Sequence, residues 1–239
     1  MTEHELPDHT IDRTIALVRT SLDGLLSANA RRPVVLGIAG AQGSGKSMIA
    51  RLLAGQLNVD GVKSATISLD DFYLSRAERR ELAARVHPLF VTRGPPGTHN
   101  LDAALSFFTS VRSGGECTAP VFDKTRDEPA PPELQRRWPA DLDVAIFEGW
   151  CLGARAQSHD ALATPINTLE REFDRDGRWR ATVNEALGSV YQTLFAKIDH
   201  LVYLRAPDFE CVRRWRVEQE EPLAATLDEN SRARLMSAD

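Results

Sequence analysis

Residues 34–47 read VVLGIAGAQGSGKS, an apolar run followed by a glycine-rich loop that ends in Lys-Ser. The last eight of these residues have the form G-x-x-x-x-G-K-S. Glycines allow such a loop to adopt positive φ angles and to turn several backbone N–H groups toward one point, where an anion can accept their hydrogen bonds. The stretch therefore predicts a strand, a phosphate-binding loop (P-loop) and a helix, with a nucleoside triphosphate as the ligand.

Side chains at the end of the loop have separate predicted roles. The ammonium group of Lys46 can reach the β and γ phosphates, and the hydroxyl of Ser47 can ligate Mg²⁺. A helix from Ser47 to about residue 57 would direct its N-terminal dipole at the same phosphates. The alternative is a glycine-rich turn followed by Lys-Ser by chance, which the strand-loop-helix context disfavours. The predicted nucleotide-binding residues are Gly40, Ala41, Gln42, Gly43, Ser44, Gly45, Lys46, Ser47 and Met48.

Length and composition favour one soluble domain. The chain has 239 residues, enough for an α/β domain with a full core, and shows no linker. Its formal net charge of −5 argues against non-specific nucleic-acid binding. Apolar runs are of strand length, the acidic N-terminus lacks a secretory pattern, and three widely spaced cysteines form no C-x-x-C pair. We expect residues 1–239 to form a single domain of a cytoplasmic protein. We expect no nucleic-acid or membrane partner, and a monomer is the favoured oligomeric state.

The order of apolar and helical segments predicts the fold class. Short apolar runs separated by helical stretches are typical of a mainly parallel sheet covered on both faces. This is the three-layer α/β/α architecture of P-loop NTPases. The expected strands are residues 34–39, 64–69, 144–147 and 201–204. The expected helices, besides that of the P-loop, are residues 11–30, 76–86, 101–112, 167–197 and 209–220.

A long insertion separates the second expected strand from the third. Residues 72–141 are rich in Pro, Gly and Arg and show little periodicity outside two helices. A connection of this length is usually functional. We therefore expect residues 72–141 to form an inserted lobe that binds the acceptor substrate.

Acidic residues follow two of the expected strands. The second strand ends in Asp70 and Asp71, and the third ends in Glu148. Ligands of open parallel sheets bind at the carboxyl ends of the strands, so these acids are aimed at the site. We predict Lys46, Asp70 and Glu148 as catalytic residues, with Asp70 as the base and Glu148 joining Ser47 at the metal. The alternatives are a turn or helix-cap pair for Asp70 and Asp71, and a buried acid paired with arginine for Glu148.

An anionic acceptor would need cations opposite it. Arg93 and His99 lie on a Gly/Pro-stiffened segment, and Lys124 and Arg126 lie further along the insertion. Surface turns are the alternative for both segments. Arg213, Arg214 and Arg216 fall on the last expected helix, where Arg213 and Arg216 are predicted to close over the phosphates as a lid, unless they form a solvated basic face. The histidines show no metal-ligand spacing.

Six short motifs follow one another over most of the chain. They are residues 40–47 (GAQGSGKS), 68–73 (SLDDFY), 93–99 (RGPPGTH), 122–124 (FDK), 147–151 (FEGWC) and 215–220 (WRVEQE). In this order they resemble the D-glycerate 3-kinase family of plants and fungi and its bacterial relatives. More distantly, the chain is similar to uridine kinase, phosphoribulokinase and pantothenate kinase. The resemblance implies ATP-dependent transfer of a phosphoryl group to a hydroxyl, with glycerate as the leading acceptor, Asp70 near the acceptor hydroxyl and Tyr73 in the acceptor site.

The chain departs from that family pattern in places. Phe122 stands where members often have Tyr, and the stretch after Lys124 is short. The chain stops at residue 239, where relatives usually continue through another helix and strand, so either a truncation or a sheet without that edge is expected. Runner-up functions are a uridine or pantothenate type of metabolite kinase and, from another class, a nucleotide-dependent switch or binding ATPase.

Overall fold

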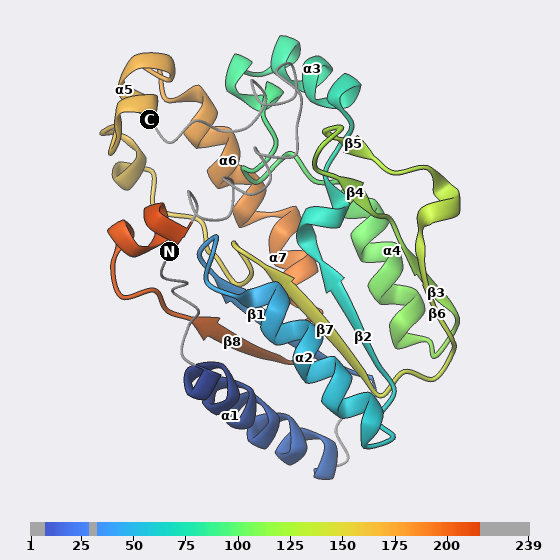
Figure 1. Ribbon diagram of the computed structural model, residues 1–239. Coiled ribbons are helices and arrows are strands. Elements are labelled where there is room, and N and C mark those ends of the chain that lie inside the picture. The colour runs from blue at the N-terminus through green and yellow to red at the C-terminus, as the bar shows by residue number, and fades with distance from the viewer. Residues whose placement is uncertain (1–7, 29–32, 216–239) are drawn as a thin grey trace.

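The computed structural model describes residues 8–28 and 33–215 (Figure 1). Its centre is a four-stranded sheet in the order β2-β7-β1-β8, and every neighbouring pair is parallel. The strands are β1 (Val34–Gly40), β2 (Ser64–Ser68), β7 (Val144–Gly149) and β8 (His200–Leu204). The predicted parallel sheet is confirmed, with each strand within two residues of its expected bounds.

Helices cover both faces of the sheet (Figure 1). The helices α1 (Asp8–Ser27) and α2 (Lys46–Val59) pack on one face, and α4 (Leu101–Arg112) and α7 (Val190–Phe195) pack on the other. Successive side chains of a strand point to opposite faces, so Leu36 contributes to the first core and Val35 to the second. The three-layer architecture is confirmed. Helix α1 begins three residues before its expected start, and residues 29 and 30, at the end of its expected range, lie outside the described part of the chain.

The insertion contains more β structure than the sequence predicts. Helices α3 (Arg76–Arg85) and α4 lie where they are expected. Two small antiparallel pairs were missed: β3 (Cys117–Ala119) with β6 (Arg136–Trp138), and β4 (Phe122–Asp123) with β5 (Glu128–Pro129). Strands of two or three residues are too short to show an alternating pattern. The remaining elements are the 3₁₀ helices η1 (Leu69–Phe72), η2 (Pro88–Val91) and η3 (Pro132–Leu134).

The expected helix over residues 167–197 is divided into three. After η4 (Asp160–Leu162) come α5 (Thr168–Phe173), α6 (Arg178–Gly188) and α7. Asp174 breaks the first helix because its carboxylate accepts hydrogen bonds from the backbone N–H groups of Trp179 and Arg180 and so caps α6. Residues 209–215 are helical, and the rest of the expected helix over 209–220 is outside the described residues. None of the described helices is long and apolar enough to span a membrane.

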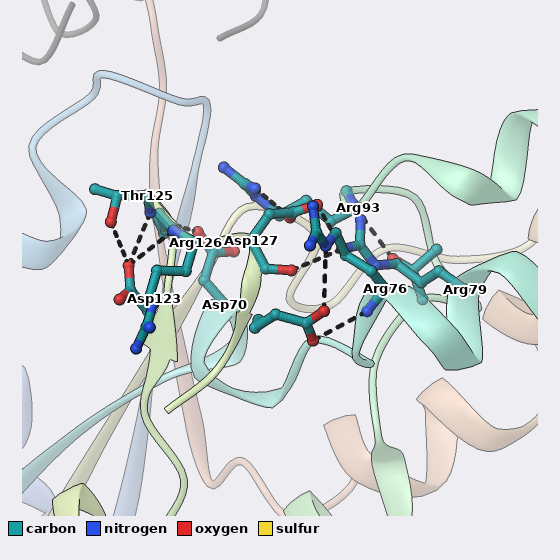
Figure 2. Close-up of polar contacts among 12 residues, drawn as sticks. Asp70, Arg76, Arg79, Arg93, Asp123, Thr125, Arg126 and Asp127 are labelled. Carbon is teal, nitrogen blue, oxygen red and sulfur yellow. Dashed lines mark hydrogen bonds and ion pairs between the residues drawn. The ribbon is translucent and has the colours of Figure 1, made fainter. Parts of the chain in front are cut away.

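One buried arginine forms hydrogen bonds with three separate segments of the insertion. Arg79 of α3 is only 1% exposed and donates to the carbonyl oxygens of Leu74 and Val91, each at 3.1 Å. It also donates to the carbonyl oxygen and, at 2.7 Å, to the carboxylate of Asp127 in the turn between β4 and β5. Arg93 donates to the other carboxylate oxygen of Asp127 (Figure 2). This ion pair links α3 to the turn between β4 and β5, while α4 and β3 of the same insertion pack into the apolar core against the sheet.

We predict that Arg79→Met lowers the free energy of unfolding by about 3 kcal/mol, because it orphans buried acceptors and removes one cation from Asp127. Arg80→Met, at the exposed neighbouring position, serves as the matched control and should change it by less than about 0.5 kcal/mol. Urea denaturation of both variants measures the difference. Equal destabilisation by the two substitutions would contradict a structural role for the buried guanidinium.

Candidate active site

The P-loop joins the end of β1 to the start of α2, as the sequence predicts. Gly43 and Gly45 have φ angles of +77° and +82°, which an L-residue rarely adopts, so these two positions require glycine. Gly45 is the N-cap of α2, and no side chain caps that helix. The Nζ of Lys46 lies 2.8 Å from the carbonyl oxygen of Ala41 and donates to it. The ammonium group thus folds over its own loop.

The loop has the properties of a site for phosphate groups. The hydroxyl oxygen of Ser44 is buried and has no hydrogen-bond partner among the described residues. The first turn of α2 has no side-chain cap, so its backbone N–H groups also lack a side-chain acceptor. Burial lowers the pKa of Lys46, while the carboxylates of Glu148 and Asp70 oppose that shift by stabilising its charge. Orphaned donors beside a buried cation fit the phosphates of a nucleotide.

Strand register brings Glu148 to the P-loop. In the sheet Glu148 pairs with Ile38 of β1 on one side and with Ser68 of β2 on the other. Its carboxylate accepts a hydrogen bond of 2.9 Å from the hydroxyl of Ser47. Glu148 is buried and is the penultimate residue of β7 rather than the residue after the strand. No arginine pairs with it among the described residues. Hydroxyl and carboxylate oxygens are ligands that Mg²⁺ prefers.

Asp70 lies just beyond the end of β2, in η1. Its carboxylate is 2.6 Å from the ammonium group of Lys124. Burial tends to raise the pKa of Asp70, but the Lys124 charge, with smaller effects from His99 and Tyr73, holds the pKa below its ordinary value. Burial raises the pKa of the Tyr73 phenol, which therefore stays protonated. Asp70 is thus an ionised acceptor of hydrogen bonds at neutral pH.

Asp71 has a different, structural environment. Its carboxylate accepts a hydrogen bond from the backbone N–H of Phe122 and lies 3.5 Å from the guanidinium of Arg136. The residue that caps η1 is neither acid but Ser68, whose hydroxyl accepts from the N–H of Asp70. The two adjacent acids therefore have different roles. Asp71 connects η1 to β4 through its hydrogen bond with Phe122, and Asp70 pairs with Lys124.

The structure changes the interpretation of the two expected cations Arg93 and His99. Arg93 is paired with Asp127 and lies over the ring of Phe122 at 5.7 Å from its centroid. His99 is buried and stacks on Tyr73. Burial lowers its pKa to about 4, although the Asp70 charge works in the other direction. Burial therefore favours a neutral imidazole at pH 7, which speaks against a positive charge from His99, and its place in the acceptor site stays a prediction.

The described part of the last expected helix, residues 209–215, meets the P-loop through Trp215, which the sequence analysis placed in the motif 215–220 without giving it a role. Trp215 packs so closely on Gly43 that a Cβ built at that glycine would lie 2.4 Å from the Cβ of Trp215. Arg213 is exposed. Arg216 lies outside the described residues. The position of Trp215 directly before Arg216, a predicted lid residue, was the available signal in the sequence. No spacing rule predicts its contact with the P-loop.

An open cleft of about 830 Å³ runs from Ser47 and Glu148 along β2 to β4 and β6. Acidic and basic residues face each other across it. The acids are Asp70, Asp71, Asp123 and Glu148, and the cations are Arg51, Lys124, Arg136 and Arg137. The sequence analysis missed the arginines because they come from α2 and β6, far from the acidic motifs in the chain. The cleft can hold a small anionic molecule beside the P-loop.

A second group of possible metal ligands has a structural explanation. His87, Asp174 and Asp176 bring ligand atoms within 4.8 Å of one another, a proximity that their sequence spacing did not indicate. Asp174 is fully buried, caps α6 and pairs with Arg180 at 3.0 Å. A guanidinium in contact with the carboxylate disfavours a cation there.

A P-loop on a parallel sheet, with carboxylates at the adjacent strand ends and a polar cleft beside them, is the arrangement of a P-loop kinase. The comparisons with known proteins give the family. Residues 35–157 match the phosphoribulokinase / uridine kinase family, and the chain belongs to that family. It is an ATP-dependent phosphotransferase that acts on a hydroxyl of a small molecule.

Individual relatives are similar over most of the chain. The uncharacterized kinase mug58 of Schizosaccharomyces pombe is 36% identical over 206 residues, which cover 82% of this chain and 73% of that protein. The chloroplastic D-glycerate 3-kinase of Arabidopsis thaliana is 28% identical, covering 79% of this chain but 41% of the plant protein. The solved structure of a D-glycerate 3-kinase from Cryptococcus neoformans has a TM-score of 0.73 and 28% identity, covering 94% of this chain and 84% of that one.

The neutral state of His99 predicts a pH dependence of stability. Its pKa is about 4 in the folded protein against an ordinary 6.5. As the pH falls from about 6.5 toward 4, the unfolded chain binds a proton that the folded protein refuses, so stability is lost. The free energy of unfolding of the native protein should therefore fall by about 3 kcal/mol more between pH 7 and pH 4 than that of His99→Gln.

Chemical denaturation at a series of pH values tests this. The control is His159→Gln, because His159 is exposed and its loss should leave the pH profile unchanged. Parallel profiles for the native protein and His99→Gln would contradict a neutral, buried imidazole.

Proposed function

We propose that the protein transfers the γ-phosphoryl group of ATP to a hydroxyl of a small hydroxy acid, with D-glycerate as the leading acceptor. The observation that carries this proposal is the pair formed by Asp70 and Lys124 at 2.6 Å, beside the hydrogen bond between Ser47 and Glu148 at 2.9 Å. Asp70, which would accept the hydroxyl hydrogen, Lys124, which would bind the carboxylate, and the P-loop, which would bind the nucleotide, lie along one edge of the sheet. Two relatives named D-glycerate 3-kinase support the choice of acid.

In this proposal the P-loop end of the cleft holds the nucleotide. Lys46, which now donates to Ala41, would turn its ammonium group to the phosphates. Ser47 and Glu148 would hold Mg²⁺, which neutralises phosphate charge when it is bound. Residues 40–45 and Met48 would contribute their backbone N–H groups. The described helix end at Trp215, together with Arg213 and Arg216, would limit the access of water to this region.

Asp70 would orient the acceptor hydroxyl. Because its pKa is lowered, it is ionised at neutral pH and can accept the hydroxyl hydrogen, but it is a weak base. Phosphoryl transfer passes through a loose transition state in which little proton removal is needed early, so an orienting carboxylate is sufficient. The proton would move to Asp70 late, as the bond to phosphorus forms.

The cations of the cleft would recognise the acid group. Lys124 is 54% exposed at its side chain, so its ammonium group can contact a ligand carboxylate. Arg93 and Tyr73 remain proposed members of the acceptor site, with Arg93 held in place by Asp127. An uncharged nucleoside would not need these cations, which favours a hydroxy acid over uridine. Pantothenate also carries a carboxylate and is therefore the runner-up acceptor.

The proposal predicts that Asp70→Asn lowers kcat by about 10²- to 10⁴-fold, because an amide orients the hydroxyl less well and takes no proton. The KM for ATP should change little. Steady-state release of ADP, measured with Mg-ATP and a panel of D-glycerate, pantothenate, uridine and related hydroxyl compounds, tests the prediction. Asp12→Asn on the exposed face of α1 is the control.

The panel also separates the alternatives. Turnover with pantothenate or uridine but not with D-glycerate would keep the kinase and discard the acceptor. ATP hydrolysis that only a macromolecule stimulates would favour a nucleotide-dependent switch and contradict the proposal.

A separate prediction concerns Lys124. Lys124→Ala should raise the KM for D-glycerate by about 10-fold or more, since a charge-assisted hydrogen bond is lost, and leave the KM for ATP nearly unchanged. Lys63→Ala removes an exposed lysine far from the cleft and should alter neither constant. An unchanged KM for D-glycerate in Lys124→Ala would contradict the assignment of Lys124 to the acid group.

A further inference from the structure

A chain of hydrogen bonds runs from the insertion to α7 and ends at His99. The backbone N–H of Gly97 lies 2.9 Å from the phenol oxygen of Tyr191. That oxygen lies 2.6 Å from Nδ1 of His99. Tyr191 is fully buried and His99 is 5% exposed. The three groups are therefore shielded from solvent and must satisfy one another.

Counting hydrogens in this chain fixes the tautomer of His99. Gly97 can only donate, so its hydrogen occupies one lone pair of the Tyr191 oxygen and the phenol hydrogen remains free for Nδ1. Tyr191 stays un-ionised because burial raises its pKa. If Nδ1 carried the proton instead, the buried phenol hydrogen and the lone pair on Nε2 would both lack partners. The arrangement with the proton on Nε2 leaves a single group unpartnered.

That single group is the N–H at Nε2 of His99. The atom is buried and has no hydrogen-bond partner among the described residues. Buried donors without an acceptor are rare in folded proteins and usually have a specific reason. The imidazole stacks on Tyr73 with ring centroids 4.3 Å apart. Tyr73 directly follows η1, which contains Asp70, and its backbone forms a β-bridge with that of His99. The unpartnered donor thus belongs to the group of side chains around Asp70.

We propose that Tyr191 is a positioning residue that holds His99 in the tautomer protonated at Nε2, and that this N–H donates a hydrogen bond to an oxygen of the phosphate acceptor bound at Asp70. The inference rests on the proposed function for the identity of that site. It makes His99 a neutral donor rather than a base, because Nδ1 is already occupied by Tyr191. A carboxylate or hydroxyl oxygen of a hydroxy acid is the matching partner.

The tautomer can be measured without any acceptor. In the ¹⁵N-labelled full chain at pH 7, long-range ¹H–¹⁵N correlation should show His99 protonated at Nε2, with the signals assigned by their loss in His99→Gln. Tyr191→Phe removes the hydroxyl while keeping the ring, and should give a mixture of tautomers. Protonation at Nδ1 in the native protein, or an unchanged pattern in Tyr191→Phe, would overturn the positioning role.

Kinetics test the contact with the acceptor. With D-glycerate, or whichever hydroxyl compound of the panel supports turnover, Tyr191→Phe should raise the acceptor KM about 5- to 10-fold and leave the KM for ATP within twofold. His99→Gln, whose amide can replace the donor, should retain more activity than His99→Met. Tyr203→Phe, at a position that is 64% exposed, is the matched control. Equal effects of Gln and Met at position 99 would overturn the donor role.

The two measurements separate this inference from the function on which it rests. If no compound of the panel is phosphorylated, the proposed function fails, while the tautomer experiment still decides the role of Tyr191. If D-glycerate is phosphorylated but does not shift the Nε2–H signal of His99 on binding, the kinase assignment stands and the contact is refuted.

Discussion

The parallel pairing of β7 between β1 and β2 is the constraint on which the candidate site depends. Glu148 pairs with Ile38 on one side and Ser68 on the other. Because parallel strands end at the same edge, this register places the P-loop, the carboxylate and η1 next to one another. A shift by one residue would turn Glu148 to the opposite face of the sheet and remove its contact with Ser47. The apolar faces of the same strands, buried under four helices, oppose such a shift.

Sequence patterns predicted the parts of the fold that repeat or carry a local signature. Helix α4 occupies the expected residues 101–112, because Asn100 caps it and apolar residues recur at helical spacing. The P-loop was predictable since its glycines are contiguous in the chain. The small strand pairs were not predictable, because two or three residues have no measurable period. The break at Asp174 was missed for a related reason: helical spacing continues on both sides of it.

The predicted site residues stay predictions, but several of them lie together at one edge of the sheet, in pairings that the sequence did not indicate. Asp70 and Lys124 are 54 positions apart in the chain, yet the Nζ of Lys124 lies 2.6 Å from the carboxylate of Asp70. No local sequence pattern predicts this pair. His99 was read as a cation because its segment also carries Arg93, yet burial keeps it neutral. Tyr191 gave no signal at all, since its partner Gly97 is 94 positions away. Long-range polar contacts depend on tertiary packing, which sequence patterns describe poorly.

The pairing of Lys124 with Asp70 has a consequence for selectivity under the proposed function. A ligand that brings its own carboxylate can exchange with Asp70 for the ammonium group, so Asp70 becomes free for the hydroxyl at the moment the acid binds. A neutral alcohol offers Lys124 no replacement and leaves Asp70 engaged. Water is the most abundant neutral hydroxyl compound, so the same ion pair would protect the bound nucleotide from hydrolysis until an acid arrives.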